Sequence, residues 1–272
     1  MTSGQVARRG DQGSEPAGRR GVPAGRGGGT AGPRDGARIL LLWDIDGTLI
    51  DGGHVVESIY PVVFERLTGR PARHRVSIAG RTELDIMDEL FARHDVGAVE
   101  PDRVTAELAA ELRRRAGELR SVGRALPGAA EALRALGNRD EVAQSVLTGN
   151  LRDNAALKLG SFALAEFIDP TIGAYGDDAR ERAALLPIAR RRAAAAHGAD
   201  FAAGATVLIG DTPRDVHTGR GGGARVIAVA TGASGADALR EAGADVVLAD
   251  LRDTAAVVRA VRTPGPPTRV PE

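Results

Sequence analysis

The sequence contains no cysteine, which excludes disulfide bonds and thiolate metal sites. It also has no excess of charge, since Lys and Arg together number 36 and so do Asp and Glu, so no global field favours nucleic acid or an anionic membrane. No apolar run reaches the length of a membrane-spanning helix, and the N-terminal segment lacks the apolar core of a signal peptide. These absences lead us to expect a cytoplasmic protein with no membrane and no nucleic-acid partner.

Lysine is nearly absent as well. Lys158 is the only lysine among the 36 basic residues, and the other 35 are arginines. Together with abundant Ala and Gly, this bias is typical of a GC-rich genome and does not indicate nucleic-acid binding. A lysine that persists against such a bias points to a specific requirement for it.

Both ends of the sequence predict disordered tails. Residues 1–36 carry 11 glycines and three prolines without apolar periodicity, and such a segment cannot bury enough surface to fold alone. The segment has six arginines against three acids, which leaves a weak RNA- or partner-binding role as the alternative. Residues 263–272, rich in proline, read as a second tail.

Between the tails, short apolar runs alternate with longer helical patterns. This alternation predicts an α/β fold in which a parallel sheet is covered by helices on both faces. The predicted strands are 39–44, 143–148, 206–210 and 225–230, with weaker candidates at 245–248 and near 168–172, and the predicted helices are 128–137, 151–160, 180–197 and 235–242.

One interval breaks the alternation. Most of residues 55–120 are helical in pattern, and the interval is far longer than a simple crossover needs. We therefore predict a helical cap at 54–123, inserted into an α/β core formed by 37–53 and 124–262.

The first predicted strand ends in two acids. An apolar run is followed by Asp44, Ile45 and Asp46, and then by Gly-Thr. Ligands of open α/β sheets gather at the carboxyl ends of strands. Two carboxylates placed there repel each other unless they share a cation or a proton, which suits a catalytic site. The alternative is a strand followed by an ordinary Asp-Gly turn.

Two further strand ends carry polar residues. An apolar strand ends in Gly210-Asp211, and Asp215 follows four residues after Asp211; oxygen ligands of this kind suit a hard cation such as Mg²⁺. The alternative is helix capping by Asp211 or Thr212. The predicted strand 143–148 ends at Thr148 and is followed by Gly149 and Asn150. The hydroxyl of Thr148 and the free backbone amides after it suit a phosphate oxygen, and a simple turn is the alternative.

Asp-x-Asp-Gly-Thr and Gly-Asp-x-x-x-Asp together resemble the motifs of the haloacid dehalogenase superfamily of hydrolases, and phosphoglycolate phosphatase-like enzymes with a helical cap are the nearest comparison. The resemblance covers about 37–261 and implies a Rossmann-like core. It implies that Asp44 is the nucleophile, forming an aspartyl-phosphate, and that Asp46 is the general acid and base. It also implies Mg²⁺ held by Asp44, the backbone carbonyl of Asp46, and Asp211, with Asp215 close by.

The resemblance further implies phosphate binding by Thr148 and by the backbone near Gly149 and Asn150. It requires a basic residue that pairs with the nucleophile and the phosphoryl group. Arg182 matches that place best, and Lys158 is the alternative. Lys158 lies ten residues beyond Thr148, so a continuous helix would carry it ~15 Å away, which favours a surface or structural role.

Within the cap, Gly80-Arg81-Thr82 resembles a segment whose arginine contacts substrate in some relatives. The alternative for Arg81 is an exposed arginine near the start of a helix. From the sequence we therefore expect a Mg²⁺-dependent phosphatase that acts on a small phosphomonoester. The alternatives are a sugar phosphomutase with the same residues and a non-catalytic binding module on this scaffold.

Overall fold

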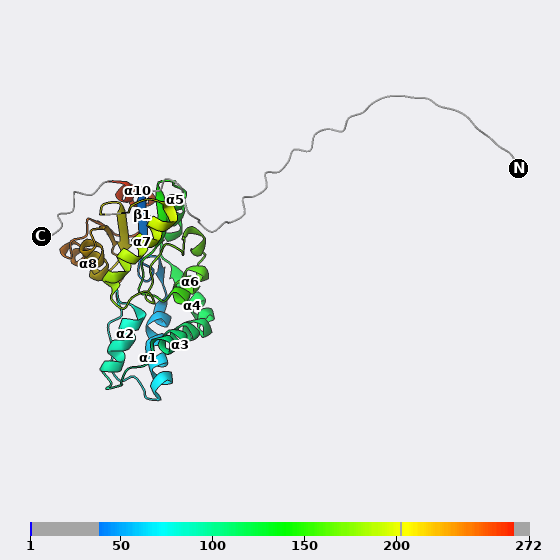
Figure 1. Cartoon of the computed structure of the whole chain (residues 1–272), viewed down its shortest axis with the longest axis vertical. Helices are drawn as coiled ribbons and strands as arrows, with labels where there is room; N and C mark the ends of the chain where they lie inside the picture. The colour runs from blue at the N-terminus through cyan, green and yellow to red at the C-terminus, as the bar shows by residue number, and fades with distance from the viewer. Residues whose placement is uncertain (2–37, 202, 264–272) are drawn as a thin grey trace, which may run out of the picture.

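The computed structural model describes Met1, residues 38–201 and residues 203–263 (Figure 1). The two predicted tails, apart from Met1 and Thr263, lie outside these residues. None of the helices in the described ranges combines the length and apolarity that a membrane span requires.

A five-stranded parallel sheet forms the centre of the core. Its order is β4-β1-β5-β6-β7. The strands are β1 (Ile39–Trp43), β4 (Val142–Val146), β5 (Thr206–Gly210), β6 (Arg225–Val229) and β7 (Val246–Leu248). The first four are almost wholly buried, as parallel strands covered on both faces are, which is why their sequences are mostly apolar. The exception is β4, which carries the buried polar residues Gln144 and Ser145.

Helices pack on both faces of this sheet, which confirms the predicted fold class. Alternate residues of β1 belong to two different clusters: Leu41 and Trp43 pack with α5 and α10, whereas Leu40 and Leu42 pack with α7. The helices of the core are α5 (Ala129–Gly137), α6 (Arg152–Ser161), α7 (Leu185–His197), α8 (Pro213–Gly221), α9 (Ala236–Glu241) and α10 (Thr254–Arg262), with short 3₁₀ turns η1 (Ala165–Phe167) and η2 (Arg182–Ala184).

Two sequence predictions differ from this arrangement. The candidate strand near 168–172 is absent, and the following chain makes only an isolated bridge between Leu147 and Ala174. The helical pattern at 180–197 is divided, because η2 precedes α7 and holds Arg182 in a tight turn of its own.

The segment between β1 and β4 contains four helices, α1 (Gly53–Thr68), α2 (Glu83–Ala92), α3 (Pro101–Arg114) and α4 (Ala116–Val122). We call residues 53–122 the helical insertion. Its apolar side chains form a cluster that is separate from the clusters around the sheet. A short antiparallel pair, β2 (Ile50–Asp51) with β3 (Arg124–Ala125), holds the two ends of the insertion side by side. In Figure 1 the insertion lies below the core.

Candidate active site

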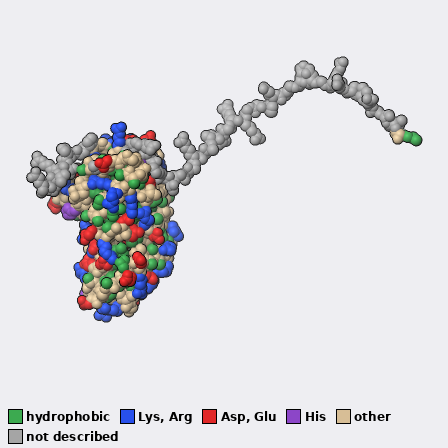
Figure 2. All heavy atoms as spheres, in the orientation of Figure 1, with side chains coloured by type: hydrophobic (Ala, Val, Ile, Leu, Met, Phe, Trp, Pro, Cys, Tyr) green, Lys and Arg blue, Asp and Glu red, His purple; other side chains and the backbone are tan. Residues whose placement is uncertain are grey.

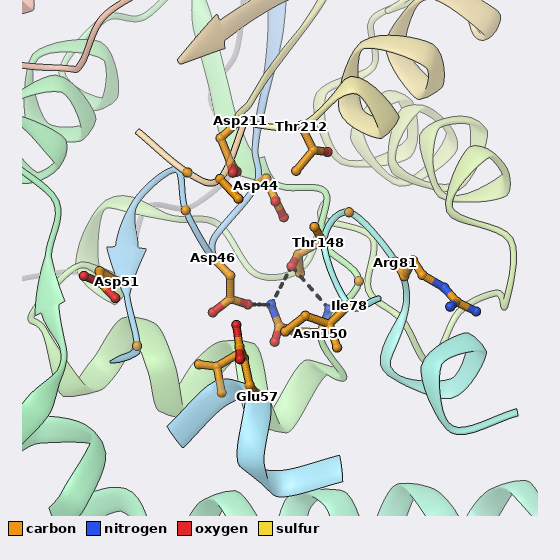
Figure 3. Close-up of a pocket in the computed structure, with 18 of the residues that line it drawn as sticks. Asp44, Asp46, Asp51, Glu57, Ile78, Arg81, Thr148, Asn150, Asp211 and Thr212 are labelled. Carbon is orange, nitrogen blue, oxygen red and sulfur yellow. Dashed lines mark hydrogen bonds between the residues drawn. The ribbon is translucent and has the colours of Figure 1, made fainter. Parts of the chain in front are cut away.

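A cavity of about 350 Å³ lies between the core and the helical insertion. We call its lining residues at 44–52, 126, 148–150, 182, 211–212 and 231–233 the core wall, and those at 53–83 the insertion wall. The core wall includes the carboxyl ends of β1, β4 and β5, so the cavity occupies the place where parallel sheets bind ligands (Figure 3).

The two acids of the first motif lie directly beyond β1. The backbone N–H of Asp44 donates to the carbonyl of Ile209 (2.8 Å), which extends the pairing with β5 by one residue. Gly47 then adopts a left-handed conformation (φ 80°), and any side chain there would collide with the carboxylate of Asp211. The glycine therefore lets the turn after Asp46 approach Asp211 closely.

Three buried carboxylates meet at this turn. Asp44, Asp211 and Asp215 each offer an oxygen that lies within 4.8 Å of the others. Asp211 accepts a hydrogen bond from the hydroxyl of Thr48 (2.9 Å). The donors near the two strand ends are all oxygens, as hard cations prefer, so the residues present fit a divalent ion such as Mg²⁺.

Asp215 accepts more hydrogen bonds through its side chain than the other two acids do. Its Oδ2 accepts hydrogen bonds from the backbone N–H (3.1 Å) and the hydroxyl (2.6 Å) of Thr212. The hydroxyl of Thr212 in turn accepts from the backbone N–H of Asp215, so the two residues form the capping box of α8. The capping alternative from the sequence thus holds for Thr212, and it holds together with the acidic cluster.

Burial of these acids shifts their titration. It raises the pKa of Asp44 to about 6, against the opposing charge of Arg182, and the charges of Asp215 and Asp46 raise it further. Burial and the charges of Asp215 and Asp44 raise the pKa of Asp211 to about 8. Ionised together, these groups destabilise one another, and a cation between them would remove that cost.

Arg182 reaches the cluster from η2. Its buried guanidinium contacts Asp44 Oδ1 (3.0 Å) and Asp215 Oδ1 (2.5 Å) through Nη2. The same atom lies 3.4 Å from the carbonyl of Leu147. The structure therefore places Arg182 beside the predicted nucleophile.

Lys158 also contacts the site: of the surface or structural role expected for it, the surface position is wrong, and the side chain is buried in an ion pair with Asp46. It is 0% exposed, and its Nζ donates to both carboxylate oxygens of Asp46 (2.7 and 2.9 Å) and to Asn150 Oδ1 (2.5 Å). The distance argument failed because α6 begins only at Arg152, and helical side chains point back towards the N-terminus of their helix. Each of the two basic residues thus pairs with a different aspartate.

The residues that follow β4 connect these groups. Asn150 Nδ2 donates to Asp46 Oδ2 (2.7 Å) and to the Thr148 hydroxyl oxygen (2.7 Å). The backbone N–H of Asn150 also donates to that hydroxyl oxygen (3.3 Å), so both acceptor positions of Thr148 are used and its proton remains to donate. Gly149 lies against the backbone of Arg81, where a Cβ would collide with the carbonyl.

Arg81 lines the cavity, but its guanidinium does not reach the centre of the site, so the predicted contact with substrate stays a prediction. Arg81 Nε donates to Asp85 (2.6 Å), and Nη1 also contacts Glu89. Figure 3 shows the side chain pointing away from Asp44 and Asp46. The reason is local: the first two turns of α2 present acids that neutralise this arginine outside the cavity.

Three polar residues of the insertion wall were not predicted from the sequence, namely Glu57, Tyr60 and Glu83. Glu83 is buried, and its Oε2 accepts from the backbone N–H of Leu151 (3.1 Å) and from Asn154 (2.8 Å). Burial raises the pKa of Glu83 to about 7, and it raises that of Tyr60 as well. Acids are common in the first turn of a helix, so nothing in the sequence distinguished Glu83.

These features define an α/β enzyme whose site lies between a parallel sheet and an inserted helical unit. A family model for haloacid dehalogenase-like hydrolases matches residues 40–223, which is more than half of the chain. The chain therefore belongs to the haloacid dehalogenase-like hydrolases, as its motifs predicted. No curated protein matches it in sequence.

Solved structures share the fold at low sequence identity. A hydrolase from Pseudomonas syringae superposes with a TM-score of 0.60 at 20% identity, covering 83% of this chain and 100% of its own. A predicted phosphatase from Clostridium acetobutylicum gives 0.60 at 15% identity, covering 82% and 99%. A protein assigned as a β-phosphoglucomutase from Thermotoga maritima gives 0.52 at 18% identity, covering 81% and 98%.

Proposed function

We propose that this hydrolase is a Mg²⁺-dependent phosphatase that cleaves a small phosphomonoester through an aspartyl-phosphate on Asp44. The observation that carries the proposal is the pairing at the end of β1. Asp44 lies against Arg182 and Asp211, whereas Asp46, two residues later, is held by Lys158. The first aspartate thus lies beside a guanidinium and a carboxylate that suit phosphate and a cation, whereas the side chain of the second is paired with a lysine, which supports different roles for the two.

In the first half of the reaction, an oxygen of Asp44 attacks the phosphorus, and the bond from phosphorus to the leaving oxygen breaks. Asp46 enters this half protonated on Oδ1, the oxygen with a single donor, and gives this proton to the leaving oxygen, so the leaving group departs as a neutral alcohol. The guanidinium of Arg182, the hydroxyl of Thr148 and the backbone of Gly149 and Asn150 bind the phosphoryl oxygens. In the second half, Asp46 takes a proton from water, the water oxygen attacks phosphorus, and Asp44 is released with inorganic phosphate.

The carboxylates of Asp44 and Asp211 and the backbone carbonyl of Asp46 would hold the Mg²⁺. Asp215 contributes mainly by fixing Arg182 and the start of α8, because both of its oxygens already have partners. When bound, the ion supplies positive charge that offsets the charge developing on the phosphoryl oxygens.

Lys158 and Asn150 act on Asp46 as positioning residues. Three hydrogen bonds from their side chains hold the carboxylate in place, so its orientation is set before substrate binds. Lys158 can do this because it is wholly buried and has no competing solvent contact. This arrangement gives the sole lysine of the sequence a specific task.

We also propose that the enzyme acts in the cytoplasm on a small phosphorylated molecule and not on nucleic acid. The support is the balanced charge and the absence of cysteine in the sequence. A cavity of about 350 Å³ is of the size that accommodates small metabolites.

The test is phosphate release from a panel of small phosphomonoesters, measured with the full chain in Mg²⁺ and again with a chelator. We expect release in Mg²⁺ and its loss on chelation. Absence of release from every ester would contradict the proposal. If phosphate then moved between positions of a sugar phosphate without release, the sugar phosphomutase alternative would take its place.

A further inference from the structure

Glu57 is a carboxylate of the insertion wall that has no partner. It lies on α1, is exposed, and in Figure 3 its carboxylate points across the cavity towards Asp46. Its side chain makes no hydrogen bond or ion pair with any residue that the structure describes, whereas Asp46 is fully engaged with Lys158 and Asn150. The negative charge of Glu57 is therefore available to a ligand.

Basic side chains do not compensate this charge. Among the described residues that line the cavity, Arg81 and Arg182 are the only basic ones. Arg182 is committed to Asp44 and Asp215, and the guanidinium of Arg81 is committed to Asp85 and Glu89. The insertion wall thus presents an acid to the cavity without a free cation beside it.

Glu83 adds a second acceptor on the same wall. Its Oε2 has two donors, but its Oε1 is buried without a hydrogen-bond partner among the described residues. A buried acceptor left unpaired destabilises the protein unless a donor from a ligand or a water reaches it. The hydroxyl of Tyr60, another lining residue, also has no partner in the described structure, and the charge of Glu83 contributes to its raised pKa.

We propose that the insertion wall selects a phosphomonoester whose leaving group carries hydrogen-bond donors and no acid, with an ammonium group bound best. This inference rests on the proposed phosphatase function and names the substrate class for it. Carboxylates only accept hydrogen bonds, so Glu57 pairs with ammonium or hydroxyl groups. A carboxylate on the leaving group would face a like charge with no cation to offset it, and that repulsion acts as a selection against acidic esters.

The experiment compares esters that carry an amine, a hydroxyl or a carboxylate on the leaving group, matched at one terminal position in the two-carbon series and by carbon number in the six-carbon series. The two-carbon series is ethanolamine phosphate, 2-hydroxyethyl phosphate and 2-phosphoglycolate, and the six-carbon series is glucosamine 6-phosphate, glucose 6-phosphate and 6-phosphogluconate. Each is assayed with the full chain in Mg²⁺, with p-nitrophenyl phosphate as a reference for phosphatase activity. We expect kcat/KM to be highest for the amine and lowest for the carboxylate in whichever series is turned over.

A pair of variants assigns the effect to Glu57. In Glu57→Gln the ratio of kcat/KM for the amine over the carboxylate should fall roughly fivefold, the upper end of what an exposed ion pair contributes. Glu65→Gln is the matched control, because Glu65 is an exposed acid on the same helix and does not line the cavity. This ratio is independent of the fraction of enzyme that is folded, so a destabilised variant still reports on selectivity.

The results distinguish a failure of the proposed selectivity from a failure of the proposed phosphatase function. If phosphate is released but the carboxylate ester is cleaved as well as the amine or better, the selectivity is overturned and the phosphatase stands. An unchanged ratio in Glu57→Gln overturns the role of Glu57 in the same way. If no ester, including p-nitrophenyl phosphate, is cleaved, the phosphatase proposal fails and the selectivity falls with it.

Discussion

The two walls of the cavity differ in whether their acidic side chains are paired with basic ones. On the core wall, Asp44 is paired with Arg182 and Asp46 with Lys158, at distances of 3.0 and 2.7 Å. On the insertion wall, Glu57 has no partner in the described structure, and Arg81 turns outwards to α2. The two catalytic candidates of the core wall are thus each paired with a cationic side chain, whereas Glu57 on the insertion wall has no such partner in the described structure.

The face of the molecule that Figure 2 shows does not share this division. Acidic and basic side chains are interspersed over the visible face of both the core and the insertion (Figure 2). Many of the exposed pairs, such as Arg66 with Glu107, lie within the insertion itself. Surface pairs of this kind contribute little to stability, so the contrast that matters for function is the one inside the cavity.

If the residues of the core wall catalyse the reaction, Asp44→Asn should cause the largest loss of kcat. The amide keeps the size of the side chain but cannot serve as the nucleophile, so we expect kcat to fall by at least about a thousandfold. Thermal unfolding should show that the fold is intact. Near-normal phosphate release from this variant would remove Asp44 from the mechanism and with it the role assigned to the core wall.

Arg182→Met tests whether the pairing on the core wall also stabilises the fold. The variant leaves Asp44 and Asp215 buried without their cation, and breaking such a buried pair costs about 3 kcal/mol of unfolding free energy. Denaturation in urea without metal would measure it, and Arg182→Lys should recover part of the loss. A stability equal to that of the natural protein would show that the two acids do not depend on Arg182.

The raised pKa values of Asp211 (about 8) and Asp44 (about 6) predict an unusual pH dependence for the metal-free protein. The unfolded chain ionises these acids near the ordinary value of 3.8, whereas the folded chain keeps their protons to higher pH. Because the folded state binds more protons in that window, its stability falls as the pH rises from about 4 to about 8.

Mg²⁺ should reverse that loss, because it binds the ionised acids of the folded state. We therefore expect Mg²⁺ to raise the melting temperature by several degrees at about pH 8 and by much less at about pH 5. Thermal melts at both pH values, with and without the ion, measure the difference. The same increase at both pH values would contradict this account of Asp44 and Asp211, and Asp211→Asn serves as the control in which the pH dependence is reduced.

The sequence predicted the core wall far better than the insertion wall, and the reason is physical. Asp44, Asp46 and Asp211 follow strands, and the carboxyl ends of parallel strands meet at one edge of a sheet, so their proximity follows from the pattern alone. Glu83 of the insertion wall sits on α2, where its contacts depend on where the helix begins and how the insertion packs on the core. The buried position of Lys158 was missed on the core side for the same reason, because its contacts depend on where α6 begins. Apolar periodicity does not encode those placements.

Arg81→Gln tests the basic residue of the insertion wall, and of these variants it should have the smallest effect on activity. The guanidinium is held by Asp85 and Glu89 and points away from Asp44, so the reaction does not depend on its charge. We expect kcat/KM for p-nitrophenyl phosphate to change by less than about threefold, with a stability loss of about 1 kcal/mol from the broken pairs. A hundredfold fall in kcat/KM would instead mean that Arg81 turns into the cavity when substrate binds. Glu57 would then have a cationic neighbour, and the charge contrast between the two walls would disappear in the bound state.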